Sequence, residues 1–319
     1  MAGLADAALL AAIAVGSARG ASALQRASWP RRSPAAAILL WQALGLAGGL
    51  ATVGALLAVG VSEPGSRPAG VLSGLGALPG ELASGRFLAA HEPPVVIVAR
   101  AATIVAGLTL LSTLWWMLVT AFADAIGARR RQRELLALLA HGDPKAPGAL
   151  VVDYPAAAAY CLPGIRSQIV VSVGTLDLLA PAELAAVLAH ERAHLRARHD
   201  LVLIPFTSLR RAFPRSRVVA QAHRTVALLV EMMADDRALR VRGLLARELA
   251  TALLRFGTAG SACPPAGALA AAGTEGELTA RVNRLLTPPP PLPRPVQAMV
   301  ILAAALLVAA PLLLLVIPA

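Results

Sequence analysis

Residues 186–200 read A-V-L-A-H-E-R-A-H-L-R-A-R-H-D, and this stretch decides how the rest of the chain is interpreted. His190 and His194 stand four residues apart, and Glu191 directly follows the first histidine, which gives the pattern H-E-x-x-H. On a helix, side chains at positions i and i+4 share a face, so the two imidazoles can bind one ion. Glu191 then lies where it can take a proton from a water molecule beside that ion. We predict that His190 and His194 bind zinc and that Glu191 is the catalytic base of peptide hydrolysis.

The third zinc ligand decides between a metal site and three polar residues that share a solvated helix face by chance. We expect one helix from Pro181 to Asp200, because neither glycine nor a further proline interrupts it. In the longer pattern H-E-x-x-H-x-x-G-x-x-H a glycine folds the chain back, but Ala197 stands at that position here. Asp200 would then lie about 15 Å along the helix axis from His190. We therefore expect Asp200 to support a ligand or the fold, and His199 to be solvated.

Glu231 is the better candidate for the third ligand. It follows His194 by 37 residues and begins the segment E-M-M-A-D, in which Glu231 and Asp235 share one helix face. Glu231 can bind the ion while Asp235 accepts the free N–H of a ligand histidine and fixes its tautomer. The alternative is that Glu231, Asp235 and Asp236 form the solvated face of an amphipathic helix. Their position after H-E-x-x-H favours the metal site.

For four further residues the sequence leaves both a role in the site and a surface position open. Arg281 and Arg284 could pair with acidic residues of the two metal-binding helices, or could lie free on a helix surface. His223 and Arg224 precede Glu231 by about two turns and could stabilise an oxyanion, although surface positions are favoured.

The composition indicates a membrane protein. The chain has 319 residues, a mean hydropathy of +0.68 and 57% hydrophobic residues, which is too apolar for an ordinary soluble protein. Its net charge of +11 could indicate a nucleic-acid partner, but only 3% of the residues are aromatic, too few for a stripe of alternating basic and aromatic residues on which bases stack. We therefore expect no direct nucleic-acid binding. Cys161 and Cys263 lack C-x-x-C spacing, which predicts reduced thiols and no thiolate zinc site.

Four apolar stretches are candidate membrane spans: residues 3–18, 35–61, 95–122 and 296–317. The last three reach the roughly 20 residues that a bilayer requires. Arginines cluster between the first two stretches and directly after the third, so the positive-inside rule places both regions in the cytoplasm. Both termini then lie outside, provided that residues 3–18 also span. We predict a multi-pass protein of the bacterial cytoplasmic (inner) membrane.

The predicted organisation has an N-terminal membrane domain (1–128), a cytoplasmic zinc metalloprotease domain (129–295) and a C-terminal transmembrane helix (296–319). The middle domain is expected to contain a short amphipathic helix over 133–140, strands over 149–154 and 168–173, and helices over 181–200, 216–242 and 277–286. The predicted fold class is a mainly α integral membrane protein with about four transmembrane helices. Its cytoplasmic domain is a zincin-like α+β domain with a small sheet.

Four segments together resemble a known family: A-Y-C-L-P-G (159–164), I-V-V-S-V-G (169–174), E-L-A-A-V-L-A-H-E-R-A-H-L-R-A-R-H-D (183–200) and L-V-E-M-M-A-D-D-R-A-L (229–239). They resemble the bacterial membrane zinc metallopeptidases of the β-lactam sensor/antirepressor type, which cleave the penicillinase repressor. They are similar, more distantly, to the CAAX prenyl protease and heat-shock membrane protease group. The resemblance covers about residues 150–240 in detail.

The resemblance implies that His190, His194 and Glu231 bind one zinc ion per chain and that Glu191 is catalytic. It also implies a substrate-binding edge strand, to which a peptide would add as a further strand. The residues of that strand are Ala159, Tyr160, Cys161 and Leu162.

A DNA-binding repressor is the substrate that the resemblance implies. The sensor members of the family carry an extracellular ligand-binding domain after the last span, whereas the present sequence ends at Ala319. We therefore expect no direct β-lactam sensing by this polypeptide.

Two rival functions remain beside a membrane-bound zinc endopeptidase acting on a cytoplasmic or membrane-proximal protein. The first is a non-cleaving membrane signalling or scaffold protein that retains the zinc-binding fold. Glu191 argues against it, because a structural zinc site needs no general base. The second is proteolysis inside the bilayer, for which Arg192, Arg196 and Arg198 make the motif helix too polar. The sequence leaves the substrate, the activating signal and the oligomeric state open.

Overall fold

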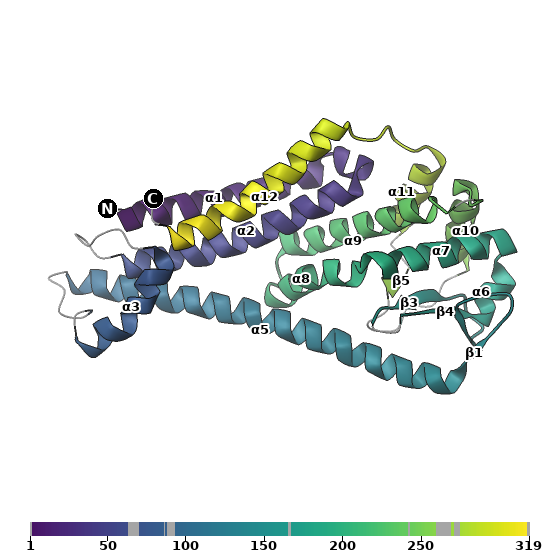
Figure 1. The fold of residues 1–319 in the computed structure, drawn as a ribbon, viewed down its shortest axis with the longest axis horizontal. Helices are drawn as coiled ribbons and strands as arrows, with labels where there is room; N and C mark the ends of the chain where they lie inside the picture. The colour runs from purple at the N-terminus through teal and green to yellow at the C-terminus, as the bar shows by residue number, and fades with distance from the viewer. Residues whose placement is uncertain are drawn as a thin grey trace. The chain divides into compact units, whose positions relative to one another are not determined.

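The computed structural model describes residues 2–62, 70–85, 87, 93–164, 167–241, 243–259, 269–270 and 275–317. The protein is mostly helical with a small mixed sheet (Figure 1). It divides into two compact units. Unit 1 comprises Met1–Pro30, Ala36–Trp116 and Leu292–Ala319, and unit 2 comprises Arg31–Ala35 and Met117–Pro291. The domain boundaries predicted at 128/129 and 295/296 stay predictions.

Unit 1 is built from helices that the apolar stretches predict. Among the described residues, four helices are long and apolar enough to cross a membrane, which fits a membrane protein. A helix over 71–83, inside the 62–94 connection, was not predicted. The elements are α1 (Ala2–Arg26), the start of the 3-10 turn η1 (Trp29–Arg32), α2 (Pro34–Val61) except its first two residues, α3 (Val71–Ala83), the first part of α5 (Pro94–Leu139) and α12 (Arg294–Val316).

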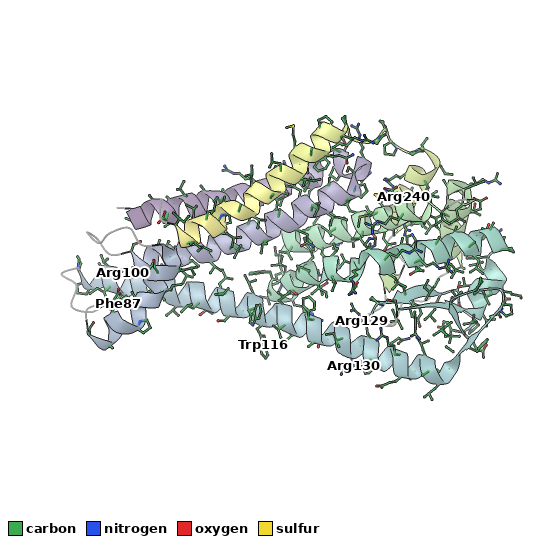
Figure 2. The ribbon with its side chains drawn as sticks, viewed as in Figure 1. Phe87, Arg100, Trp116, Arg129, Arg130 and Arg240 are labelled. Atoms are coloured by element: carbon green, nitrogen blue, oxygen red, sulfur yellow. The ribbon has the colours of Figure 1, made fainter. Side chains whose placement is uncertain are left out.

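Arg100 lies inside unit 1, although it is a charged residue within the apolar stretch 95–122. Its side chain is buried, and its Nε donates to the carbonyl of Gly60 at 3.1 Å. The guanidinium carbon lies 5.1 Å from the ring centroid of Phe87 (Figure 2). Arg100 therefore joins α5 to the end of α2, in place of a contact with solvent.

Helix α5 runs unbroken for 46 residues. The separate amphipathic helix predicted over 133–140 is therefore wrong, because the span and this segment form one helix. The residues after 122 are mostly Ala, Arg, Gln, Glu and Leu, which are strong helix formers, and Gly127 alone does not interrupt them. The helix thereby carries Leu136 to the sheet of unit 2, where it is buried.

The sheet contains five short strands among the described residues, in the order β1-β2-β4-β3-β5. Strand β2 runs parallel to β4, and the other neighbouring pairs are antiparallel. The strands are β1 (Ala140–Gly142), β2 (Leu150–Val152), β3 (Ala159–Leu162), β4 (Gln168–Ser172) and β5 (Leu269–Ala270). Strands β2 and β4 lie within the predicted strands 149–154 and 168–173.

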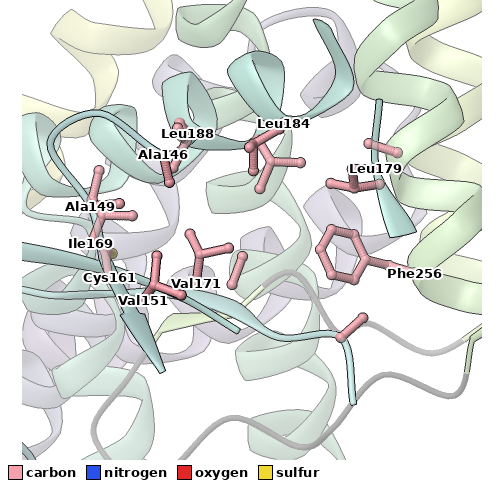
Figure 3. Packing of buried hydrophobic residues seen from close by; sticks show 14 residues of the cluster. Ala146, Ala149, Val151, Cys161, Ile169, Val171, Leu179, Leu184, Leu188 and Phe256 are labelled. Carbon is pink, nitrogen blue, oxygen red and sulfur yellow. The ribbon is translucent and has the colours of Figure 1, made fainter. Parts of the chain in front are cut away.

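Side chains of β3 alternate between the two faces of the sheet, as the two-residue period of a strand requires. Ala159 and Cys161 belong to the core between the sheet and the helices that cover it (Figure 3). Tyr160 and Leu162 pack on the opposite face with Leu136 of α5. The sheet is thus buried on both sides at this strand.

The helices of unit 2 are α6 (Val173–Leu178), α7 (Pro181–Ala197), α8 (His199–Ala212), α9 (Arg217–Ala238), α10 (Ala246–Thr258) and α11 (Glu275–Leu286). Helix α7 begins with Pro181 in its first turn, and the carboxylate of Glu183 accepts the backbone N–H of Ala180 at 2.9 Å. One side of α7 packs on the sheet through Leu184 and Leu188. Its other side packs on α9 and α10, and α11 packs on these two helices in the same cluster. Helix α7 is therefore central in unit 2.

The expectation of one helix through Asp200 is wrong, because α7 ends at Ala197. Arg198 adopts φ 48° and ψ 47°, the left-handed region, alone among the described non-glycine residues. Its backbone N–H still closes the last turn on the carbonyl of Leu195. Such a conformation costs a non-glycine residue about 1 kcal/mol, so tertiary contacts must impose it. The bend starts α8 at His199 and turns that side chain back toward α7.

Ser172 supports the fold at the junction of β4 and α6. Its hydroxyl accepts the N–H of Thr175 at 3.2 Å and that of Ala158 at 2.9 Å, and donates to the carbonyl of Ala156 at 2.8 Å. We predict that Ser172→Ala lowers the free energy of unfolding by about 1–2 kcal/mol, because an N-cap and a buried donor are lost. Thermal unfolding should then occur roughly 2–8 °C lower.

The matched control is Thr279→Ala, which removes an exposed hydroxyl bonded to a carbonyl of its own helix. It should change stability by less than about 0.5 kcal/mol. Equal unfolding temperatures for the two variants would show that the Ser172 network does not stabilise unit 2.

Candidate metal centre

The structure brings His190, His194 and Glu231 together. The two histidines lie on one face of α7 and the glutamate on α9, and one ligand atom from each lies within 4.8 Å of the others. The two Nε2 atoms are 3.0 Å apart. The carboxylate of Glu231 lies 3.3 Å from Nε2 of His190 and 3.5 Å from Nε2 of His194. Three lone-pair donors therefore converge on one point.

Asp235 holds the outer nitrogen of His190. Its Oδ1 lies 2.9 Å from Nδ1 of His190, and at this distance the carboxylate favours a proton on Nδ1, which leaves Nε2 for the cluster. Burial disfavours a charged His190, but the hydrogen bonds of Asp235 and Glu231 outweigh it and raise the pKa of His190 to about 9. When a metal ion displaces the second proton of this imidazole, Asp235 keeps the remaining proton on Nδ1 and thereby fixes the tautomer.

Arg281 of α11 balances the two carboxylates. Its Nε and Nη2 donate to Asp235 at 2.9 and 2.7 Å, and its Nη1 lies 3.0 Å from Oε2 of Glu231. Burial alone would raise the pKa of Asp235, but the guanidinium outweighs it and lowers that pKa to about 2. Likewise His194 and Arg281 overcome burial and hold the pKa of Glu231 well below its usual range. Of the two alternatives for Arg281, pairing with acidic residues is therefore the observed one.

His199 is the partner of His194, and the expectation that it is solvated is wrong. Its side chain is 0% exposed, and its Nδ1 lies 2.9 Å from Nδ1 of His194. Burial, with the positive field of His194 and Arg237, lowers the pKa of His199 to about 3, so it stays neutral. A neutral His199 can accept the Nδ1 proton of His194, which leaves the Nε2 lone pair of His194 free. Sequence analysis missed this role because the turn at Arg198 has no signal in residue type.

Glu191 lies on α7 beside the cluster and is 1% exposed. One of its carboxylate oxygens, Oε2, has no hydrogen-bond partner among the described residues. The thiol of Cys161 interacts with this carboxylate by a hydrogen bond, and burial raises the pKa of Glu191. Burying a carboxylate oxygen without a hydrogen bond lowers the stability of the fold. Such groups are common where a carboxylate takes part in a reaction.

The other predicted polar residues lie outside the cluster. Asp200 pairs with Arg129 of α5 at 2.9 Å, which joins α8 to α5. Arg284 donates twice to Asp236, at 2.7 and 2.8 Å. His223 is half-buried, with its Nε2 3.4 Å from the hydroxyl of Thr207. Cys263 lies outside the described residues.

Strand β3 is not an edge strand, which corrects the position that the resemblance implied for it. Tyr160 and Cys161 pair with Ala270 and Leu269 of β5, so the backbone of β3 is bonded on both sides. All four side chains, Ala159, Tyr160, Cys161 and Leu162, are buried. A role for this strand in substrate binding would therefore use its backbone, and that role stays a prediction.

The donor set fits a catalytic zinc ion. Two imidazoles and one carboxylate are a common protein ligand set for catalytic zinc, with a fourth position left for water or substrate. Nitrogen lone pairs 3.0 Å apart repel each other unless a proton or a cation lies between them. Three carboxylates (Glu191, Glu231 and Asp235) and one guanidinium (Arg281) leave two negative charges when all are ionised, which a divalent ion would neutralise.

One comparison with known proteins supports this chemistry. The family model described as Peptidase family M48 matches residues 124–259, a range that contains α7 and α9. This match supports a metallopeptidase, and peptidases of family M48 are typically zinc-dependent. No curated protein and no solved structure matches the chain.

We predict that zinc affinity rises with pH. In the metal-free protein His190 is a doubly protonated imidazolium at pH 7, since its pKa is about 9. Zinc binding must displace the second proton. The apparent association constant should increase about tenfold per pH unit from neutral pH and level off near pH 9. Competition with a chelating dye at constant ionic strength measures it. In Asp235→Asn the increase should end at lower pH, and a constant affinity in wild type would contradict the assignment.

We also predict that His199→Leu binds zinc about 10–100-fold more weakly, because His194 loses the acceptor that fixes its orientation. His199→Asn should recover most of the affinity, since its amide can reach His194 Nδ1. Zinc per chain after dialysis against graded chelator gives the comparison. Arg196→Gln, an exposed position on the same helix, is the control. Equal affinities for His199→Leu and this control would rule out the role.

Proposed function

We propose that the chain is a membrane-bound zinc-dependent endopeptidase that hydrolyses peptide bonds of a cytoplasmic or membrane-proximal protein. One observation carries the proposal. The Nε2 atoms of His190 and His194 and the carboxylate of Glu231 converge beside the buried Glu191, which has a carboxylate oxygen free of hydrogen bonds among the described residues. This arrangement supplies three ligands and a base at one point.

The residues have separate tasks in this proposal. His190, His194 and Glu231 hold the ion, and Asp235 and His199 keep the two imidazoles oriented. A bound zinc ion would supply Lewis acidity for the scissile carbonyl and for the attacking water. Glu191 accepts a proton from the attacking water and passes it to the leaving nitrogen. The raised pKa of Glu191 suits a group that must both accept and release a proton near neutral pH.

The proposed location is the bacterial cytoplasmic membrane, with the protease part in the cytoplasm and both termini outside. Four long apolar helices support a membrane location. The arginines after residue 128 support the cytoplasmic side for the protease part.

The proposed substrate class follows from the resemblance to the β-lactam sensor/antirepressor peptidases, whose substrate is a DNA-binding repressor in a regulatory proteolysis pathway. A peptide that added to β3 would have to replace the pairs that Tyr160 and Cys161 make with β5. Substrate binding at this strand thus requires that β5 first release its hydrogen bonds.

A non-cleaving scaffold with the same zinc-binding fold is less well supported. Burial of a carboxylate oxygen without a partner costs about 1–3 kcal/mol or more. A structural zinc site would gain nothing from Glu191 at that cost, whereas a hydrolase needs the free oxygen as a base.

Glu191→Gln tests the function. The variant should bind zinc as wild type does, because Glu191 is not a ligand, and should cleave casein at least about 100-fold more slowly, because the base is lost. Metal content and cleavage are measured on the purified full chain in lipid nanodiscs. His190→Ala should lose both zinc and activity, whereas Thr279→Ala should keep both. Zinc-loaded wild type without peptidase activity would favour the scaffold, and full activity of Glu191→Gln would refute the proposed mechanism.

A further inference from the structure

The hairpin of α8 and α9 is strongly basic at its tip. Between Asp200 and Glu231 the chain contains five arginines and no acidic residue. Four of the arginines lie within eight residues around the turn that joins the two helices: Arg210, Arg211, Arg215 and Arg217. All four are exposed. Such a cluster repels itself unless an anionic partner lies nearby.

The same tip exposes apolar side chains among the arginines. Phe213 is 41% exposed and Val218 is 53% exposed, and Pro214 between them is also exposed. Basic residues around an exposed aromatic ring are typical of surfaces that lie in the interfacial layer of a bilayer. An aromatic ring there replaces water contacts with acyl-chain contacts, while the arginines remain among the headgroups.

An ion pair places the tip at the membrane end of the cytoplasmic part of α5. Arg211 Nη1 lies 2.6 Å from Oδ2 of Asp124 on α5. Asp124 follows the last residue of the apolar stretch 95–122 by two positions, about 3 Å along the helix axis. Trp115 and Trp116 on the same helix are 66% and 63% exposed, as expected of an aromatic belt at the interface. Within unit 2, the tip therefore lies beside the segment of α5 in which the apolar stretch ends.

We propose that the α8–α9 tip is a second membrane contact of the protease unit, in which anionic lipid headgroups bind Arg210, Arg211, Arg215 and Arg217 and Phe213 enters the interface. The proposal rests on the membrane location given above and goes beyond the spans themselves. A nucleic acid or an acidic protein could bind the same charges. Neither accounts for the exposed Phe213 and Val218 beside the segment in which the apolar stretch ends, whereas a bilayer surface does.

The test uses the full chain in vesicles, with the Cys263→Ser change so that a single accessible cysteine can be introduced. Cys161 is 0% exposed and should not react. An environment-sensitive fluorophore is attached at Phe213→Cys or, as the matched control, at Val241→Cys, which is 44% exposed in the same unit. Vesicles contain phosphatidylcholine alone or with about 30% phosphatidylglycerol, and lipids spin-labelled near the headgroup act as quenchers.

In anionic vesicles the label at 213 should shift to shorter wavelength and be quenched, and the label at 241 should not. Arg215→Gln with Arg217→Gln should lower the equilibrium constant for the bound tip about 30-fold, or about 2 kcal/mol at 1.4 kcal/mol per tenfold. Arg240→Gln with Arg247→Gln removes the same charge elsewhere on the unit and should leave the label at 213 quenched. Added salt should weaken the quenching.

The proposal is overturned if the label at 213 stays as accessible to water as the one at 241, or if it responds equally without anionic lipid. A response to added oligonucleotide or polyglutamate that lipid does not produce would also overturn it. Quenching of the native tryptophans by brominated acyl chains reports insertion separately. Unquenched tryptophans would overturn the membrane location together with this proposal, whereas quenched tryptophans with a water-exposed label overturn this proposal alone. Zinc binding and cleavage are also measured for the variant with Arg215→Gln and Arg217→Gln. These two measurements test the proposed peptidase function separately from membrane contact.

Discussion

The pairing of the Asp235 carboxylate with His190 and Arg281 is the interaction on which the candidate metal centre depends. The carboxylate is 1% exposed and lies between Nδ1 of His190 and the guanidinium of Arg281. Removing ionised groups from water costs several kcal/mol per ion, and mutual attraction offsets this only when geometry and hydrogen bonding are both good. Here Arg281 uses Nε and Nη2 on Asp235 and directs Nη1 at Glu231, so α9 and α11 are fixed in one register. Helix α11, which follows the matched range 124–259, is therefore part of the metal centre.

The two candidate ligand histidines have different partners, and this affects the charge of the candidate metal centre. His190 faces a carboxylate through its outer nitrogen, whereas His194 faces the neutral imidazole of His199. A carboxylate partner makes an imidazole a more basic ligand than a neutral partner does. With His199 in place of a second carboxylate, the buried cluster avoids a further negative charge that Arg281 alone could not balance. The cluster therefore stays close to the charge that one divalent ion can neutralise.

Much of the site could be predicted from the sequence, because regular helical spacing determines it. His190 and His194 had to share a face of any helix, and so did Glu231 and Asp235. The turn at Arg198 could not be predicted, since a left-handed conformation without glycine is imposed by tertiary contacts. For the same reason His199 was placed in solvent, where a continuous helix would have put it. The sequence left open whether Arg281 pairs with acidic residues or lies free on a helix surface, because its contact with Asp235 spans 46 residues of chain. Strand β5 is two residues long, too short for any pattern.

The distribution of charge along α9 connects the metal centre with the tip of the hairpin. A helix dipole favours anions in the first turn and cations in the last, by about 0.3–1 kcal/mol each. Helix α9 departs from this pattern, with Arg217 in its first turn and with Asp235 and Asp236 beside Arg237 near its end. Arg281 and Arg284 of α11 compensate the acidic end by direct ion pairs. At the basic end, residues 201–230 offer no acidic side chain, so the hairpin itself cannot compensate Arg217. Anionic headgroups would supply that charge from outside the chain. In this proposal the bilayer surface compensates the charge at the first end of α9, as α11 compensates the charge at the last.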